Sequence, residues 1–242
     1  MSGNIRLYVD QPLGAGQSVT LSRDQAHYLF GVMRKGLGAE VLLFNGQDGE
    51  WRADVVEAGK RGGSLTCMEQ TRGLQVPPDL WLCFAPIKKA RTDFIVEKAA
   101  EMGARRIVPV ITEYTNAGRL NRERLQAHAL EAAEQCGGTF VPEVADAVKF
   151  GVLLDRWDGA RGIMFCDEAL SGRSSSLPAV LAAPTAILIG PEGGFSDRER
   201  ARLAGFEAAH AVSLGPRILR ADTAAVAALT LWQQALGDWD AA

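Results

Sequence analysis

The feature that most constrains the fold is a pair of glycine- and proline-rich segments in the C-terminal part of the chain. Residues 187–199 read ILIGPEGGFSDRE, and residues 213–225 read SLGPRILRADTAA. The apolar, β-branched run at residues 185–189 predicts a buried strand that leads into the first segment. Glycine and proline then end the strand, and Ser196 followed three residues later by Glu199 is typical of a capping box that opens a helix.

The second segment repeats this plan of strand, loop and helix. Residues 210–214 predict a strand, and the Gly-Pro pair that follows predicts a turn. Asp222 or Thr223 is expected to be the N-cap of an alanine-rich helix that reaches about residue 236. Because loops at the carboxyl ends of neighbouring strands form the crevice in which α/β sheets bind ligands, the two segments predict a binding site.

Charged residues lie among the glycines of both loops. Glu192 lies in the first loop, and Arg217 and Arg220 lie in the second. The simplest alternative to a ligand site is that both loops are ordinary strand-to-helix connections. Such connections need neither charged residues nor so many glycines. Glycine lets a backbone approach a ligand closely, so the combination favours a ligand site.

Strands and helices alternate after residue 80, which predicts an α/β domain with a parallel sheet. The predicted strands are residues 80–85, 107–111, 162–166, 185–189 and 210–214. Besides the helix that Ser196 opens, the predicted helices are residues 92–102, 121–135, 148–157 and 221–236, with a helical turn at 177–181. Gly103 is expected to follow the end of its helix as the C′ residue, and Asn121 to cap the next helix.

The first 73 residues have a mainly β pattern. Strands are predicted at residues 5–9, 18–21, 39–44, 51–56 and 64–68. Turn-forming residues at 45–49 predict a hairpin, and one helix is predicted at about residues 23–33 with Ser22 as its N-cap. Short strands closed by turns suggest a small barrel. Paired prolines stiffen the linker at 73–79, so we predict two domains, residues 1–73 and residues 74–242.

The net charge of −3 argues mildly against a nucleic-acid partner, whose usual footprint is a strongly basic domain. Any RNA site must therefore be a local patch. Each basic cluster of the chain is a candidate, although each is also compatible with an ordinary solvated face. The clusters are Lys88, Lys89 and Arg91; Arg105 and Arg106; and Arg119, Arg122 and Arg124.

Several other classes of protein are disfavoured by the composition. The four cysteines are far apart and the three histidines are scattered, so we expect neither a disulfide framework nor a metal site. No apolar run approaches the ~18 residues of a membrane helix, and residues 1–10 lack the pattern of a signal peptide. Neither GxGxxG after the first strand nor a GK[ST] loop is present, which disfavours a Rossmann or P-loop enzyme. We expect a cytoplasmic protein with no membrane partner and no metal.

The two C-terminal segments also resemble the sequence motifs of a known protein family. LIGPEGGFS at residues 188–196 and SLGPRILR at 213–220 resemble the knotted, SPOUT-type methyltransferases, and most closely the ribosomal RNA small subunit methyltransferase E family. The sequence of residues 27–46 resembles the PUA-like N-terminal domain of that family, so the resemblance spans nearly the whole chain. Four residues depart from the family pattern. Gly31 and Gly138 stand where the family usually has an arginine. Tyr114 replaces a polar or basic residue, and Asp222 replaces a glutamate.

The resemblance implies a fold, an activity and partners. The fold would be α/β, with a C-terminal SPOUT-type trefoil-knot methyltransferase domain and a mainly β, PUA-like barrel that binds RNA. The activity would be methylation of N3 of a uridine in 16S ribosomal RNA, with S-adenosyl-L-methionine as the cofactor. The partners would be 16S ribosomal RNA within the small ribosomal subunit and a second copy of the chain in a homodimer.

The resemblance further implies that the cofactor lies between the two loops and the start of the last helix. The residues expected to bind it are Ile189, Gly190, Pro191, Glu192, Gly193, Gly194, Leu214, Gly215, Ile218, Leu219, Thr223 and Ala224. An arginine beside the uracil would stabilise the charge that develops when N3 loses its proton, and Arg220 is the first choice, with Arg217 as the second. Glu192 is expected to act as general base or to hold the arginine; a loop carboxylate that caps backbone amides is the plain alternative.

Arginines outside the two loops complete the expected site. The residues expected to contact RNA are Arg34, Arg91, Arg122 and Arg217. A non-catalytic RNA-binding protein that keeps the fold is the second hypothesis. Cofactor binding distinguishes the two, because a protein that only binds RNA has no need of both glycine loops.

Overall fold

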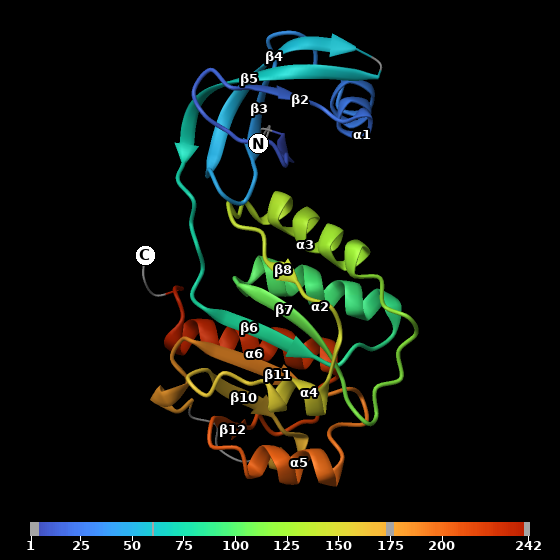
Figure 1. Cartoon of the computed structure of the whole chain (residues 1–242), viewed down its shortest axis with the longest axis vertical. Coiled ribbons are helices and arrows are strands. Elements are labelled where there is room, and N and C mark those ends of the chain that lie inside the picture. The colour runs from blue at the N-terminus through green and yellow to red at the C-terminus, as the bar shows by residue number, and fades with distance from the viewer. Residues whose placement is uncertain (1–4, 60, 173–176, 240–242) are drawn as a thin grey trace. The chain divides into compact units, whose positions relative to one another are not determined.

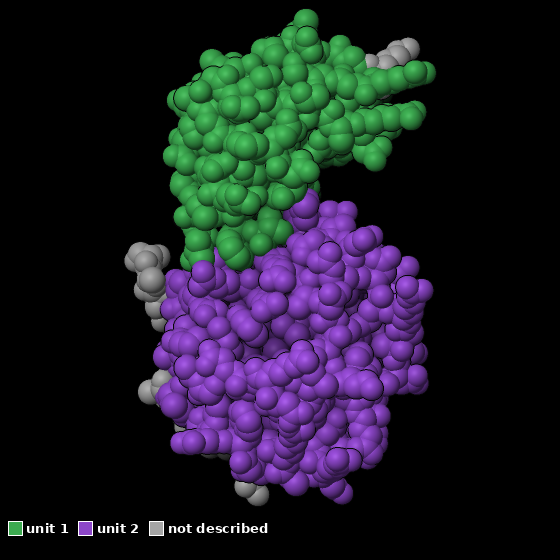
Figure 2. Space-filling model, viewed as in Figure 1, with its two compact units in different colours: residues 1–76, 133–141 green, residues 77–132, 142–242 purple. Residues whose placement is uncertain are grey.

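The computed structural model describes residues 5–59, 61–172 and 177–239. The chain forms two compact units (Figures 1 and 2): unit 1 contains residues 1–76 and 133–141, and unit 2 contains residues 77–132 and 142–242. Residues 133–141 thus join unit 1, although the sequence assigns them to the second domain. The division of function between residues 1–73 and 74–242 stays a prediction.

Unit 1 is built on a five-stranded sheet with the order β1-β3-β4-β5-β2. The strands are β1 (Arg6–Tyr8), β2 (Ser18–Thr20), β3 (Glu40–Phe44), β4 (Glu50–Gly59) and β5 (Gly62–Arg72). β1 pairs with β3 in parallel, and the other pairs are antiparallel. The predicted hairpin joins β3 to β4, with Gly46 and Gly49 both at φ of 76°.

A short helical segment follows β2 in unit 1. Ser22 caps α1 (Arg23–Ala26) through a capping box with Gln25, as the sequence predicts for the cap. The chain then widens into a π-helical turn, η1 (His27–Val32), in which the amide of Met33 donates to the carbonyl of Tyr28. The helical stretch therefore has the predicted extent, but the sequence did not show its change of winding.

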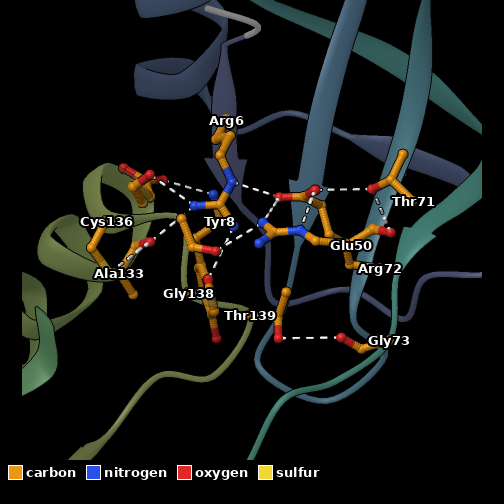
Figure 3. Close-up of polar contacts among 12 residues, drawn as sticks. Arg6, Tyr8, Glu50, Thr71, Arg72, Gly73, Ala133, Cys136, Gly138 and Thr139 are labelled. Atoms are coloured by element: carbon orange, nitrogen blue, oxygen red, sulfur yellow. Dashed lines mark hydrogen bonds and ion pairs between the residues drawn. The ribbon is translucent and has the colours of Figure 1, made fainter. Parts of the chain in front are cut away.

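Glu50 is the centre of a buried charge cluster in unit 1 (Figure 3). Its carboxylate accepts hydrogen bonds from Arg6 Nε at 2.6 Å, Arg72 Nη2 at 2.6 Å and Thr71 Oγ1 at 2.9 Å, and the residue is only 3% exposed. Desolvation by burial would raise the pKa of Glu50. The hydrogen bonds from Arg72, Arg6 and Thr71 outweigh this and lower the pKa from 4.5 to about 2.

The two arginines of this cluster also bind the backbone of residues 133–138 (Figure 3). Arg6 Nη1 donates to the carbonyls of Ala133 and Glu134 at 2.9 and 2.8 Å, and Arg72 Nη2 donates to that of Gly137 at 2.8 Å. These carbonyls lie at the C-terminal end of α3 (Arg122–Cys136), where a helix leaves acceptors unpaired and favours positive charge. The cluster therefore attaches this end of α3 to the sheet of unit 1.

Unit 2 is built on an all-parallel sheet with the order β12-β10-β11-β6-β7-β8, and β9 also pairs with β7. The strands are β6 (Leu80–Phe84), β7 (Arg106–Ile111), β8 (Glu143–Val144), β9 (Val148–Lys149), β10 (Gly162–Cys166), β11 (Thr185–Ile189) and β12 (Ala209–Val212). The other helices of this unit are α2 (Lys89–Glu101), α4 (Phe150–Asp155), α5 (Asp197–Ala204) and α6 (Ala221–Leu236).

Helices cover both faces of this sheet (Figure 1). Alternate residues of a strand point to opposite faces, so Leu82 and Phe84 pack with α2, α3 and α6, whereas Cys83 packs with α4 and α5. Among the described residues, no helix has the length and apolar character that crossing a membrane requires.

Some element boundaries differ from the prediction. The predicted helix at 148–157 begins two residues later, because residues 148–149 pair with β7 as strand β9. The predicted N-cap of α6 is wrong: the cap residue is Arg220, without a side-chain cap hydrogen bond, and Asp222 and Thr223 already lie in the first turn. Burial of Ala221, Ala224 and Ala225 against the core explains this earlier start, since packing outweighs a cap.

Candidate functional site

A cavity of about 210 Å³ lies at the carboxyl ends of β10, β11 and β12, beside the first turn of α6. It is lined by Cys166, Asp167, Glu168, Ser171, Ile189, Gly190, Pro191, Glu192, Gly193, Leu214, Arg217, Ile218, Leu219, Ala221 and Ala224. Both glycine-containing loops therefore meet in one place, as expected of loops that follow neighbouring parallel strands. We call this the motif cavity.

The loop after β11 is closely packed at two glycines. Gly194 has φ of +67°, and a Cβ atom there would overlap the carboxylate of Glu168. A Cβ atom on Gly193 would lie 3.3 Å from Cβ of Tyr114, which belongs to the loop after β7. A side chain at either position would push the loop out of place or fill the cavity.

Arg200 holds the two walls of the motif cavity together. Its Nη2 lies 2.5 Å from Glu168 Oε1 and its Nη1 lies 3.4 Å from Asp167 Oδ1, both in the segment after β10. Its Nε donates to the carbonyl of Phe195 at 3.0 Å, at the end of the loop after β11. The arginine on α5 therefore fixes the two loops relative to each other without lining the cavity itself.

The loop after β12 forms a third wall of the motif cavity. Its Gly215 accepts a hydrogen bond at its carbonyl from the amide of Gly172, and the amide of Gly215 donates a hydrogen bond to Ser213 Oγ. Ile218 is 75% exposed although it lines the cavity, and Arg217 is exposed beside it. An apolar and a cationic side chain are thus available to a molecule that enters.

Most of the predicted cofactor residues line the motif cavity: Ile189, Gly190, Pro191, Glu192, Gly193, Leu214, Ile218, Leu219 and Ala224. Gly194 and Gly215 shape the two loops without lining the cavity, and Thr223 is exposed on the first turn of α6. The roles of all these residues stay predictions.

Five residues of the lining were not predicted from the sequence. They are Cys166, Asp167, Glu168, Ser171 and Ala221. Asp167 and Glu168 follow a predicted strand directly, so acidic residues at a strand end were the available signal. Burial raises the pKa of the Cys166 thiol to about 12, which disfavours the reactive thiolate form.

The predicted charged residues are spread over several elements. Arg217 and Glu192 line the motif cavity, and Arg220 lies between two lining residues, Leu219 and Ala221. Within residues 5–59, 61–172 and 177–239, the side chains of Glu192, Arg217 and Arg220 make no ion pair with any protein group.

The other predicted RNA contacts lie outside the cavity. Arg91 pairs with Asp222 at 3.6 Å, and Arg122 pairs with the exposed Asp146 at 3.8 Å. Arg34 is exposed in unit 1 and has φ of 54°. In the part of the chain that the structure describes, no group of three His, Cys, Asp or Glu residues is arranged to hold a metal ion.

Comparison with known proteins decides the family. An RNA methyltransferase domain family matches residues 75–233, and an RNA methyltransferase PUA domain family matches residues 21–66. Ribosomal RNA small subunit methyltransferase E of Rickettsia conorii is 30% identical over 228 residues, which cover 93% of each chain. The chain belongs to the ribosomal RNA small subunit methyltransferase E family. The member from Synechocystis is 33% identical, over 88% of this chain and 71% of that one.

Solved structures agree with this family and with the fold. The methyltransferase E of Neisseria gonorrhoeae, bound to S-adenosyl methionine, matches with a TM-score of 0.87 and 27% identity over 98% of this chain and 100% of that one. A putative methyltransferase of Legionella pneumophila, with SAM as bound cofactor, matches with a TM-score of 0.86 and 29% identity over 98% and 99%. The α/β fold with a SPOUT-type, trefoil-knot C-terminal domain and a PUA-like N-terminal domain is confirmed, and the protein is an RNA methyltransferase.

Proposed function

We propose that this protein transfers the methyl group of S-adenosyl-L-methionine to N3 of a uridine in 16S ribosomal RNA. The observation that carries the proposal is the motif cavity, in which the loops of both family motifs meet the first turn of α6. Two family relatives of known structure hold S-adenosyl methionine. The target atom follows from the family resemblance.

The residues of the motif cavity fit this cofactor. Ile189, Leu214 and Leu219 supply apolar surface for an adenine ring. Among the described residues, the amides of Gly193, Leu214 and Leu219 donate to no protein group, so they are available to a polar ligand edge. When bound, S-adenosyl-L-methionine would supply an electrophilic methyl group on its sulfonium.

The charged residues suit proton removal from N3. Loss of that proton places negative charge on the neighbouring carbonyl oxygens of the uracil. Arg220, with Arg217 as the alternative, would stabilise this charge, because both are exposed and without ion pairs among the described residues. Glu192 is an exposed carboxylate in the cavity wall and would act as general base.

The rest of the chain would bind the substrate. We assign RNA binding to residues 1–73 and methyl transfer to residues 74–242, with Arg34, Arg91, Arg122 and Arg217 as phosphate contacts. The substrate would be 16S ribosomal RNA within the small ribosomal subunit, and the protein would act in the cytoplasm without a metal.

The direct test is methylation of small subunits and of naked 16S ribosomal RNA by the purified protein, followed by mass spectrometry of the nucleosides. We expect 3-methyluridine at one position. Methylation at another atom or another base would refute the N3 assignment and leave the methyltransferase assignment intact. Absence of any methylated product on both substrates would refute the proposed reaction.

Replacing Gly193 with valine is expected to weaken binding of S-adenosyl-L-methionine by about 100-fold or more, as overpacking of a close contact does. The added side chain would meet Tyr114 or enter the cavity. Since Gly193 is not among the glycines with positive φ, the substitution changes packing without straining the backbone. Isothermal titration calorimetry measures the affinity.

Gly159→Val is the matched control, because a Cβ atom at Gly159 meets nothing within 4 Å. The control should bind the cofactor as the wild type does, and circular dichroism should show both variants folded. A folded Gly193→Val protein with wild-type affinity would remove the loop after β11 from the cofactor site.

The protein is expected to be a homodimer. Val226, Ala227 and Leu231 on α6 remain partly exposed, and Ile218 is 75% exposed in the preceding loop, so a second copy would cover apolar surface beside the motif cavity. Light scattering at micromolar concentration should give twice the chain mass of 26.0 kDa. A mass of one chain at that concentration would reject the dimer.

A further inference from the structure

A second cavity of unit 2, of about 380 Å³, lies between the starts of α2 and α3. Lys89 and Thr92 of the first turn of α2 line it, with Arg119, Asn121 and Arg124 from the loop and first turn around the start of α3. We call it the basic cavity. Its residues come from two clusters that are separate in the sequence, so only the fold brings them together.

Positive charge dominates the wall of the basic cavity. Lys89 and Arg119 are exposed, and within residues 5–59, 61–172 and 177–239 neither makes an ion pair. Arg124 forms a short ion pair with Asp93, so its charge is partly compensated. Two free cations and one paired cation face the same space, which favours an anionic ligand.

Both helices present their N-terminal ends to this cavity. Lys88 precedes α2 without a side-chain cap, and in the described part of the chain the amides of Lys89 and Ala90 have no hydrogen-bond partner. Asn121 caps α3 by accepting from the amide of Arg124 at 2.9 Å. Helix N-termini add partial positive charge and free N–H donors to the three cationic side chains.

The basic cavity lies at the same edge of the sheet as the motif cavity. β6 and β11 are neighbours, and the amide of Ala85, just after β6, donates to the carbonyl of Ile189 in the wall of the motif cavity. The loop after β7 also connects the motif cavity with the basic cavity. Its Tyr114 lies against Gly193, and its Arg119 lines the basic cavity. A polymer bound at one cavity can therefore reach the other.

We propose that the basic cavity binds a backbone phosphate of the RNA substrate while the target nucleotide is at the motif cavity. This inference rests on the proposed function, because it takes the polyanion to be the RNA that is methylated. The exposure of Lys89 and Arg119 favours a phosphate that belongs to a long chain, since both cations are reachable from outside. Arg91 and Arg122, predicted from the same sequence clusters, do not line this cavity.

The test compares Lys89→Gln, Arg119→Gln and the double variant with the wild type. We expect the double variant to bind a 16S ribosomal RNA fragment roughly tenfold more weakly near 0.1 M salt. The slope of log affinity against log salt should fall by about 1, as expected when phosphate contacts are lost. Affinity for S-adenosyl-L-methionine and the single-turnover rate at saturating RNA should remain those of the wild type.

Arg156→Gln is the matched control. Arg156 is an exposed arginine without an ion pair among the described residues, and it lies in the connection that leads into the start of β10. The control should leave RNA affinity and its salt slope unchanged. Wild-type affinity and slope in the double variant would overturn the proposal, as would an equal loss in the control.

A second experiment distinguishes binding of RNA from binding of a free anion. The design also distinguishes failure of this proposal from failure of the proposed reaction. Titration with inorganic phosphate should show only weak binding; tight phosphate binding that the double variant loses, with unchanged RNA affinity, would overturn the RNA assignment. The RNA-binding comparison does not depend on turnover. If the wild type methylates no RNA, the proposed reaction fails, whereas the salt slopes still decide whether the basic cavity holds a phosphate.

Discussion

Replacing Arg220 with alanine is expected to lower the rate of methyl transfer by about 10²–10³, the usual effect of removing a preorganised donor from a developing negative charge. The affinity for S-adenosyl-L-methionine should change little, because Arg220 lies outside the lining of the motif cavity. In the described structure its exposed side chain makes no hydrogen bond or ion pair, so its removal should not destabilise α6. Single-turnover methylation at saturating RNA and cofactor measures the effect.

Companion variants separate catalysis from binding. Arg220→Lys should restore little activity, because an ammonium lacks the planar fork with which arginine addresses two acceptors. Arg34→Ala and Arg122→Ala should weaken RNA binding with a shallower salt dependence and leave the saturated rate unchanged. A wild-type saturated rate in Arg220→Ala would transfer the role to Arg217, which already lines the cavity.

Replacing Glu50 with glutamine is expected to lower the free energy of unfolding of unit 1 by about 3 kcal/mol, at the lower end of the effect of breaking a buried ion pair. Glu50 is 3% exposed, and its partner Arg6 has a side chain that is only 12% exposed. Without the carboxylate, a mostly buried guanidinium would remain uncompensated. Urea denaturation monitored by circular dichroism and tryptophan fluorescence measures the change.

Glu69→Gln is the control for this variant. Glu69 pairs with Arg52 at 3.1 Å on the same sheet, but its side chain is 65% exposed. An exposed pair contributes only about 0–1 kcal/mol, so this variant should unfold almost as the wild type does. Equal losses in the two variants would show that burial of the Glu50 cluster has no special effect on stability.

The same carboxylate predicts a dependence of stability on pH. The pKa of Glu50 is lowered from 4.5 to about 2, so its contribution is fully present above pH 4.5 and is lost as the pH falls towards 2. The shift corresponds to about 3 kcal/mol. Between pH 5 and 2 the wild type should therefore lose stability more steeply than Glu50→Gln, as urea titrations at several pH values would show.

Local signals in the sequence predicted much of the fold. The strand at 185–189, the N-cap at Ser22 and the capping box at Ser196 appear in the structure as predicted, because each depends on residues that are close together in the sequence. The start of α6 was wrong because burial of its alanines against the core decides it. Asp222, expected as a cap, instead pairs with Arg91 of α2.

Long-range contacts could not be predicted from the sequence. Glu168 and Arg200 are 32 residues apart in the chain, and no periodicity links them. Lys89 and Arg119 lie in different basic clusters, each of which looks like a solvated face when taken alone. The two loops of the motif cavity were predictable because each carries its own pattern. The contacts of Arg200 and the basic cavity instead depend on the order of the strands in the sheet.

The attachment of residues 133–141 to unit 1 has a consequence for synthesis of the protein. Arg6 donates to the carbonyl of Ala133, 127 residues further along the chain. While the chain emerges from the ribosome, the first 76 residues can pair their strands, but Arg6 and Arg72 lack these backbone acceptors until Gly138 has been made. The N-terminal unit is therefore completed late, after the early strands of the second unit have left the exit tunnel.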